Sequence, residues 1–117
     1  MLSPLQFLER FLRLTDLQEN QLIKEKAIEI LKIAALKVKL YREFRPSDLA
    51  ASSLLVALSI LKLGKRAILK ESPQHKAEER QILEDFWSPS VVLYSSINYE
   101  ELEKPIHKLK QAIMKRS

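Results

Sequence analysis

The sequence of 117 residues is hydrophobic at 46% of its positions and charged at 30%, a balance typical of a globular chain rather than a disordered one. Its single glycine, Gly64, excludes glycine-rich phosphate loops, and the lack of cysteine excludes disulfides, thiolate nucleophiles and thiolate zinc sites. The net charge of +5 favours acidic partners, either polyanions or acidic proteins. We expect one domain over residues 1–117 and an intracellular location.

The N-terminal segment predicts a short helix from about residue 4 to residue 13, because its apolar residues recur at helical spacing. Pro4 and the charged pair Glu9 and Arg10 interrupt any long apolar region, so we do not expect a signal peptide. Asp16 or Asn20 is placed to cap a second, long amphipathic helix, which we predict from Asn20 to about Arg42.

Pro46 forces Arg45 out of the helical region, so the second helix must end before it. Ser47 is then predicted to cap a third helix over about residues 47–62, with Asp48 favouring its positive end. The run from 49 to 61 holds only apolar or small side chains, and at 13 residues it is shorter than a membrane crossing needs. We therefore predict a buried central helix wrapped by the other helices.

The sequence turns polar after Gly64, and we expect a long connection over about residues 63–86. It is predicted to contain a loop around Pro73 and one or two helical turns before Trp87. Ser88 and Pro89 predict the start of a short helix. Asn98 is predicted to cap a final amphipathic helix, which Pro105 should kink. No strand pattern occurs, so the predicted fold class is all-α.

Four segments in this order resemble the C-terminal repeat of the cyclin fold, the second of the two five-helix repeats in cyclins. They are "QFLERFL" at 6–12, Pro46 and Ser47 followed by "LAASSLLVAL", Trp87, and "NYEELEKPIHKL" at 98–109. The resemblance implies a five-helix fold around a buried third helix. The positions that carry this signature are Pro46, Ser47, Leu49, Ala50, Ala51, Ala57, Trp87, Tyr99 and Leu102. The resemblance leaves the cyclin subtype open between mitotic-type and D-type. The connection from Leu61 to Trp87 is longer than in mitotic-type cyclins, and D-type cyclins also lengthen this region.

The resemblance implies a regulatory, non-catalytic part of a cyclin that binds and regulates a cyclin-dependent protein kinase in cell-cycle control, in the nucleus and/or cytoplasm. In cyclins the first repeat makes most of the kinase contacts, and this sequence holds only the second. We therefore expect a separated C-terminal domain or a reduced cyclin-like protein. "KRAIL" at 65–69 nearly matches a docking motif of the first repeat, but polar residues follow it here, and we interpret the match as a coincidence.

We identify no catalytic, cofactor-binding or metal site in the sequence, and we expect no enzyme activity. His75 and His107 lie on separate segments without further ligands, and the serines lack a base at recognisable spacing. Ser72 precedes Pro73 and is a candidate site of proline-directed phosphorylation. We expect no membrane association.

The final helix carries a cluster of basic residues: Lys104, Lys108, Lys110, Lys115 and Arg116. A solvated helix face is the simpler interpretation of this cluster. The alternative is a surface that binds nucleic acid through its phosphates, as the related cyclin folds of general transcription factor IIB do.

Overall fold

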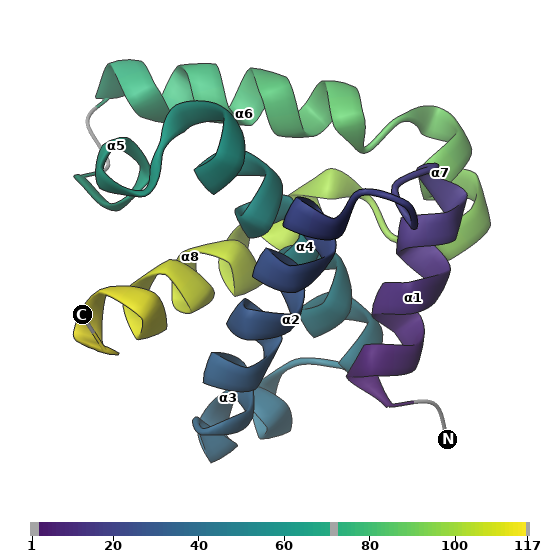
Figure 1. Ribbon diagram of the computed structural model, residues 1–117, viewed down its shortest axis with the longest axis horizontal. Helices are drawn as coiled ribbons and strands as arrows, with labels where there is room; N and C mark the ends of the chain where they lie inside the picture. The colour runs from purple at the N-terminus through teal and green to yellow at the C-terminus, as the bar shows by residue number, and fades with distance from the viewer. Residues whose placement is uncertain (1–2, 71–72, 117) are drawn as a thin grey trace.

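The computed structural model describes residues 3–70 and 73–116. All regular secondary structure in this part of the chain is α-helical (Figure 1). Eight helices, and no strand, occur among the described residues: α1 Pro4–Leu14, α2 Gln21–Ala35, α3 Val38–Glu43, α4 Pro46–Leu63, α5 Lys65–Lys70, α6 Pro73–Phe86, α7 Pro89–Ser95 and α8 Tyr99–Arg116. The predicted all-α class is confirmed. The five predicted helices correspond to α1, α2 with α3, α4, α7 and α8, whereas α5 and α6 occupy the predicted connection.

The central helix is α4, whose side chains are buried at every position from Asp48 to Ser59. It contacts α1, α2, α5, α6 and α8, and Figure 1 shows it in the middle of the molecule, behind α2. Alanine and serine side chains along α4 let the surrounding helices approach closely. The predicted buried central helix is therefore confirmed.

α4 is longer than its apolar run alone predicted. It has 18 residues with a mean hydropathy of 1.4, so by length and composition it could cross a membrane. However, 67% of these residues are buried within the domain, as in the core helix of a globular protein. Its apolar character is thus explained by packing against the other helices.

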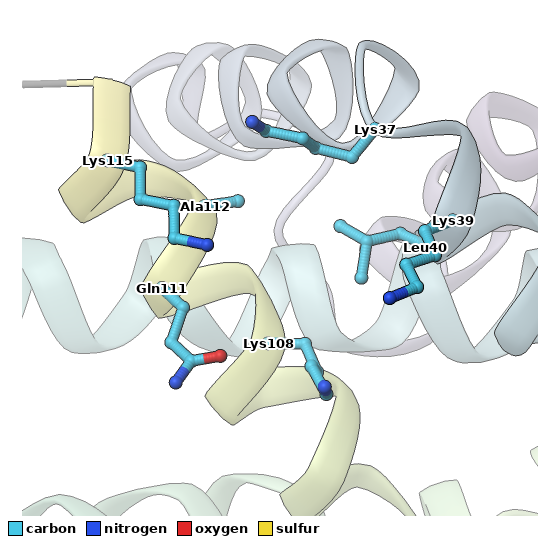
Figure 2. Close-up of a pocket in the computed structure, with 7 residues that line it drawn as sticks. All are labelled: Lys37, Lys39, Leu40, Lys108, Gln111, Ala112 and Lys115. Atoms are coloured by element: carbon cyan, nitrogen blue, oxygen red, sulfur yellow. The ribbon is translucent and has the colours of Figure 1, made fainter.

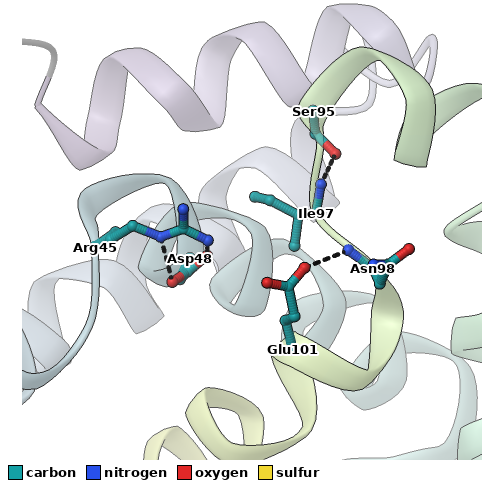
Figure 3. A network of polar contacts seen from close by, with 6 residues as sticks. All are labelled: Arg45, Asp48, Ser95, Ile97, Asn98 and Glu101. Carbon is teal, nitrogen blue, oxygen red and sulfur yellow. Dashed lines mark hydrogen bonds and ion pairs between the residues drawn. The ribbon is translucent and has the colours of Figure 1, made fainter.

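α4 begins at Pro46 with Arg45 as its N-cap, so the prediction that Ser47 caps this helix is wrong. Proline suits the first helical position, because its φ is already helical and its missing N–H would have no partner there. Ser47 follows as the second helical residue. The Arg45 guanidinium donates from Nε and from Nη2 to the two carboxylate oxygens of Asp48, each at 3.1 Å (Figure 3). Asp48 therefore lies in the first turn, where its negative charge stabilises the helix.

Side chains cap both of the first two helices. Ser3 and Gln6 form a reciprocal capping box at the start of α1, in which each side chain accepts from the backbone N–H of the other residue. Asn20, rather than Asp16, caps α2 by accepting a hydrogen bond from the Ile23 backbone N–H at 3.2 Å. Of the two capping residues that the sequence offered for α2, the structure thus selects Asn20.

The long helix predicted from Asn20 to about Arg42 is broken into α2 and α3, which corrects that prediction. The N–H groups of Leu36 and Lys37 bond to carbonyls three residues back, so the last turn tightens and α2 ends. On an unbroken helix Leu40 would lie off the apolar stripe that includes Ala34. The break turns Leu40 inward, where it is buried in the core.

The described part of the connection predicted over about residues 63–86 is largely helical, since it holds α5 and α6. The loop expected around Pro73 stays a prediction, because residues 71–72 lie outside the described part of the chain. Pro73 is the first residue of α6, a position that suits proline. α6 is polar, and side-chain hydrogen bonds one turn apart support it. They join Arg80 to Glu84 at 2.7 Å and Gln81 to Asp85 at 3.0 Å.

α7 and α8 begin where the sequence predicts. Ser88 is the N-cap of α7, although its side chain makes no capping hydrogen bond, and Pro89 is the first helical residue. α8 starts directly after Asn98 and continues through Pro105, which is fully buried. The kink expected at Pro105 stays a prediction, as does the assignment of residues 1–117 to one domain.

Candidate interaction surfaces

Most residues of the predicted fold signature lie in the core. Leu49, Ala50, Ala51 and Ala57 of α4 are fully buried, as is Leu102 of α8. Side chains in such positions can contribute packing but cannot contact a partner. The surface must therefore carry whatever this domain recognises.

Trp87 joins three parts of the fold. The residue is only 2% exposed. Its indole Nε1 donates to the Ile97 carbonyl oxygen at 2.9 Å, and its ring packs edge-on against Phe11 of α1 with 5.6 Å between ring centroids. This bond satisfies the one polar group of the indole, which explains why a tryptophan can be buried completely here.

Tyr99 is partly buried at the start of α8. It lines a hollow between α6 and α8 together with Glu79, Arg80 and Glu103. Burial raises the pKa of the Tyr99 phenol well above its ordinary value, and the negative charges of Glu79 and Glu103 raise this pKa further. The phenol is therefore neutral at physiological pH and acts as a packing group.

The chain reverses between α7 and α8 through a set of local hydrogen bonds, which Figure 3 shows beside Arg45 and Asp48. Ser95 Oγ donates to the Val91 carbonyl oxygen at 2.7 Å and accepts from the Ile97 N–H at 3.2 Å. The Glu101 carboxylate accepts from the Asn98 N–H at 2.8 Å, which is one half of a capping box. These bonds fix how α7 sits relative to α8.

α7 exposes two large apolar side chains side by side in the sequence, Leu93 at 84% and Tyr94 at 63%. They lie beside a hollow lined by both apolar and acidic residues, and we call Leu93, Tyr94 and this hollow the α7 surface. The lining residues of the hollow are Glu84, Trp87, Pro89, Val92, Leu93, Asn98, Tyr99 and Glu100. Large apolar side chains exposed together in this way commonly mark a contact with another protein.

The basic residues predicted on the last helix do not share one surface. Lys110 is buried and donates to Glu79 of α6, so its assignment to a partner surface is corrected. Lys104 is exposed but pairs with Glu43 of α3 at 3.2 Å. The side chain of Arg116 lies outside the described part of the chain, as does Ser72, the candidate phosphorylation site.

Lys108 and Lys115 lie together with two lysines from a distant part of the sequence. With Lys37 and Lys39, which lie at the start of α3, they line a small hollow between α3 and α8, and we call this the lysine hollow. Figure 2 shows Lys37, Lys39 and Leu40 facing the side chains of α8 across it. Its lining residues are Lys37, Lys39, Leu40, Lys108, Gln111, Ala112 and Lys115.

The family model of the cyclin C-terminal domain matches residues 2–117. The chain belongs to this family. The resemblance stated from four sequence segments is thus confirmed. Neither a search of curated proteins nor a search of solved structures finds a match to the chain.

Membership in the cyclin C-terminal family indicates a regulatory role, since this family is generally non-catalytic. Among the described residues, no three histidine or acidic side chains come together as metal ligands.

The sequence of this cyclin domain indicates part of each surface. It shows the apolar residues of the α7 surface, and it shows Lys108 and Lys115 of the lysine hollow. Four consecutive apolar residues from Val91 to Tyr94, in a helix of seven residues, leave at least one facing solvent. The pairing of Lys37 and Lys39 with α8 depends on the tertiary fold and has no local signal.

Proposed function

We propose that this domain is part of a cyclin that binds and regulates a cyclin-dependent protein kinase in cell-cycle control. The observation that carries the proposal is the match of the cyclin C-terminal family over residues 2–117. The kinase would be held mainly by a first cyclin repeat, and this domain would support that repeat or present a surface to a regulator. Because such kinases act inside the cell, we also propose an intracellular location, nuclear and/or cytoplasmic.

The α7 surface supports this role, because large apolar side chains exposed together commonly mark a contact with another protein. Leu93 and Tyr94 are on a short helix that is held firmly by the bonds between Ser95, Ile97 and the start of α8. A rigid helix that presents apolar side chains costs little conformational entropy when it binds. The acidic residues Glu84 and Glu100 beside the α7 surface favour a partner with basic residues at the rim.

A pull-down experiment tests the kinase proposal. The tagged domain is mixed with a separately expressed first cyclin repeat and with each member of a panel of cyclin-dependent kinases. We expect kinase retention when the first repeat is supplied and little without it. If the reconstituted pair of repeats retains none of the kinases, the proposal is wrong.

The same pull-down tests the α7 surface. The variant Leu93→Asp with Tyr94→Asp should lower retention of the first repeat or of the kinase complex, because it places charge in an apolar contact. Leu22→Asp is the matched control, since Leu22 is 70% exposed on α2, away from this surface. Equal retention of both variants and the wild type would exclude the α7 surface as the contact.

Nucleic-acid binding through the basic last helix is the second candidate, and the partly exposed Lys108 and the exposed Lys115 favour it. The burial of Lys110 and the pairing of Lys104 weaken it, because they remove two of the expected phosphate contacts. A mobility-shift titration at increasing salt tests it with Lys108→Gln and Lys115→Gln. An unchanged affinity and salt slope in this double variant would exclude α8 as a nucleic-acid surface.

A further inference from the structure

The lysine hollow gathers four positive side chains from two separate parts of the chain. Lys37 and Lys39 come from the α2–α3 junction, and Lys108 and Lys115 come from α8 (Figure 2). Within the part of the chain that the structure describes, no carboxylate forms an ion pair with any of these four lysines. By contrast, Lys26, Lys104 and Lys110 each pair with a glutamate. The positive charge of the hollow is thus not balanced by a described carboxylate.

Two helix ends reduce this charge only in part. α2 ends two residues before Lys37, and α8 ends directly after Lys115. Each helix C-terminus carries a negative partial charge of about half a unit, which favours lysines there. Two such ends offset about one of the four lysine charges, so the hollow keeps a strong positive potential. An anion that enters it relieves the repulsion among the lysines.

The size and lining of the hollow favour a single charged group over an extended polyanion. Its volume is about 180 Å³, and its apolar lining consists of the buried residues Leu40 and Ala112. The seven lining residues include no aromatic ring on which a base could stack. A single-stranded nucleic acid is usually bound along a groove that follows several phosphates.

A phosphate monoester fits this hollow better than a carboxylate does. It carries about −1.5 to −2 charges at neutral pH and offers three acceptor oxygens, whereas a carboxylate carries one charge. Lysine ammonium groups are flexible donors that can converge on such a group from several sides. We propose that the lysine hollow binds a phosphorylated serine or threonine side chain of a partner protein. The proposal goes beyond the kinase-regulating role and does not depend on it.

Fluorescence anisotropy with labelled peptides tests the proposal on the whole chain. The probe is a degenerate mixture of short peptides with a fixed central phosphoserine. The competing probes are the same mixture with serine, inorganic phosphate, and a short oligothymidine. We expect the phosphoserine peptides to bind more tightly than each of the other three probes.

Paired variants locate the site. Lys39→Gln with Lys108→Gln should weaken phosphoserine-peptide binding by roughly tenfold or more, because two charge-assisted contacts are lost. Lys62→Gln with Lys65→Gln is the control, since these exposed lysines lie outside the hollow and their loss removes the same charge. This control should leave binding within about twofold of the wild type. Lys39→Arg with Lys108→Arg keeps the charge and should keep most of the binding.

Four results would overturn the proposal. If both pairs of glutamine substitutions weakened peptide binding equally, the peptides would be attracted only by the net charge of the protein. Tighter binding of oligothymidine would make the hollow part of a nucleic-acid surface. Inorganic phosphate that binds as tightly as the peptides would indicate a small-anion site, and equal binding of the serine peptides would exclude phosphate recognition. Circular dichroism melting of each variant verifies that it is folded.

Discussion

Lys110 of α8 donates a hydrogen bond to Glu79 of α6 inside the domain, where the two side chains are only 6% and 10% exposed. Among the described residues, the other carboxylate oxygen of Glu79, Oε2, has no hydrogen-bond partner. A buried ion pair adds little net stability, because the desolvation of both charges offsets their attraction. Loss of one partner is costly, however, because the other charge stays buried and unpaired.

Lys110→Met should therefore lower the free energy of unfolding by about 3–5 kcal/mol, measured by urea denaturation. Lys104→Met is the matched control on the same helix. It removes a pair with Glu43 in which the lysine side chain is 70% exposed, so it should cost at most about 1 kcal/mol.

The double variant Glu79→Leu with Lys110→Met separates the cost of an unpaired charge from the loss of a contact. It should recover most of the stability lost in Lys110→Met, because no charge is left buried. If Lys110→Met costs no more than Lys104→Met, the pair is open to solvent and the packing of α6 against α8 is wrong in this region.

Ala57→Asp should unfold the domain rather than weaken one surface. Ala57 is fully buried in α4, so an aspartate there would be an unpaired buried charge. Leu61→Asp is the control on the same helix, because Leu61 is 42% exposed and a charge there can reach water. Circular dichroism should show a helical melting transition for Leu61→Asp and none for Ala57→Asp. A folded Ala57→Asp variant with an unchanged melting temperature would contradict the central position of α4.

The sequence was most informative where the chain is buried on all sides or broken by proline. The unbroken apolar run after Pro46 predicted α4, and Pro89 predicted the start of α7. It was least informative where helical structure depends on polar side chains. α6 has few apolar residues, so apolar periodicity does not predict it. The hydrogen bonds from Arg80 to Glu84 and from Gln81 to Asp85 stabilise this helix instead. The break that turns Leu40 inward is set by tertiary packing, which outweighs a continuous local pattern.

The candidate surfaces were predictable only in part, because sequence spacing does not say which helix faces another. Lys110 follows the same basic pattern as Lys108, yet it faces Glu79 in the interior. Lys37 and Lys39 lie far from Lys115 in the chain and meet it only through the packing of α3 near α8. The basic cluster predicted on the last helix therefore included only two of the four lysines of the hollow, Lys108 and Lys115.

Trp87→Phe should lower stability, although it preserves most of the apolar contact. The Ile97 carbonyl oxygen loses the donor that lies 2.9 Å from it, and an unsatisfied buried acceptor costs about 1–3 kcal/mol. Phe86→Leu in the preceding residue is a control, because Phe86 is only partly buried. Urea denaturation followed by circular dichroism is suitable, since Trp87 is the only tryptophan and its fluorescence is lost in the variant. Equal stability of Trp87→Phe and the wild type would show that the indole bond contributes nothing.

Tyr99 should make the stability of the domain fall at alkaline pH. Burial, followed by the charges of Glu79 and Glu103, raises the pKa of its phenol in the folded state above the ordinary value of 10.0. Since the neutral, protonated phenol is the form that the fold favours, its contribution is fully present below about pH 10 and is lost as the pH rises from there toward the folded-state pKa.

The comparison of wild type with Tyr99→Phe isolates this effect, because lysines and the other tyrosines titrate in both proteins. Between about pH 9 and pH 11 the unfolding free energy of the wild type should fall more steeply. The upper limit for one proton is about 1.4 kcal/mol per pH unit, and solvent screening of the partly exposed phenol should keep the difference below it. Urea denaturation at several pH values measures both profiles. Parallel profiles would show that the phenol ionises equally in the folded and unfolded chains, which contradicts its burial between α6 and α8.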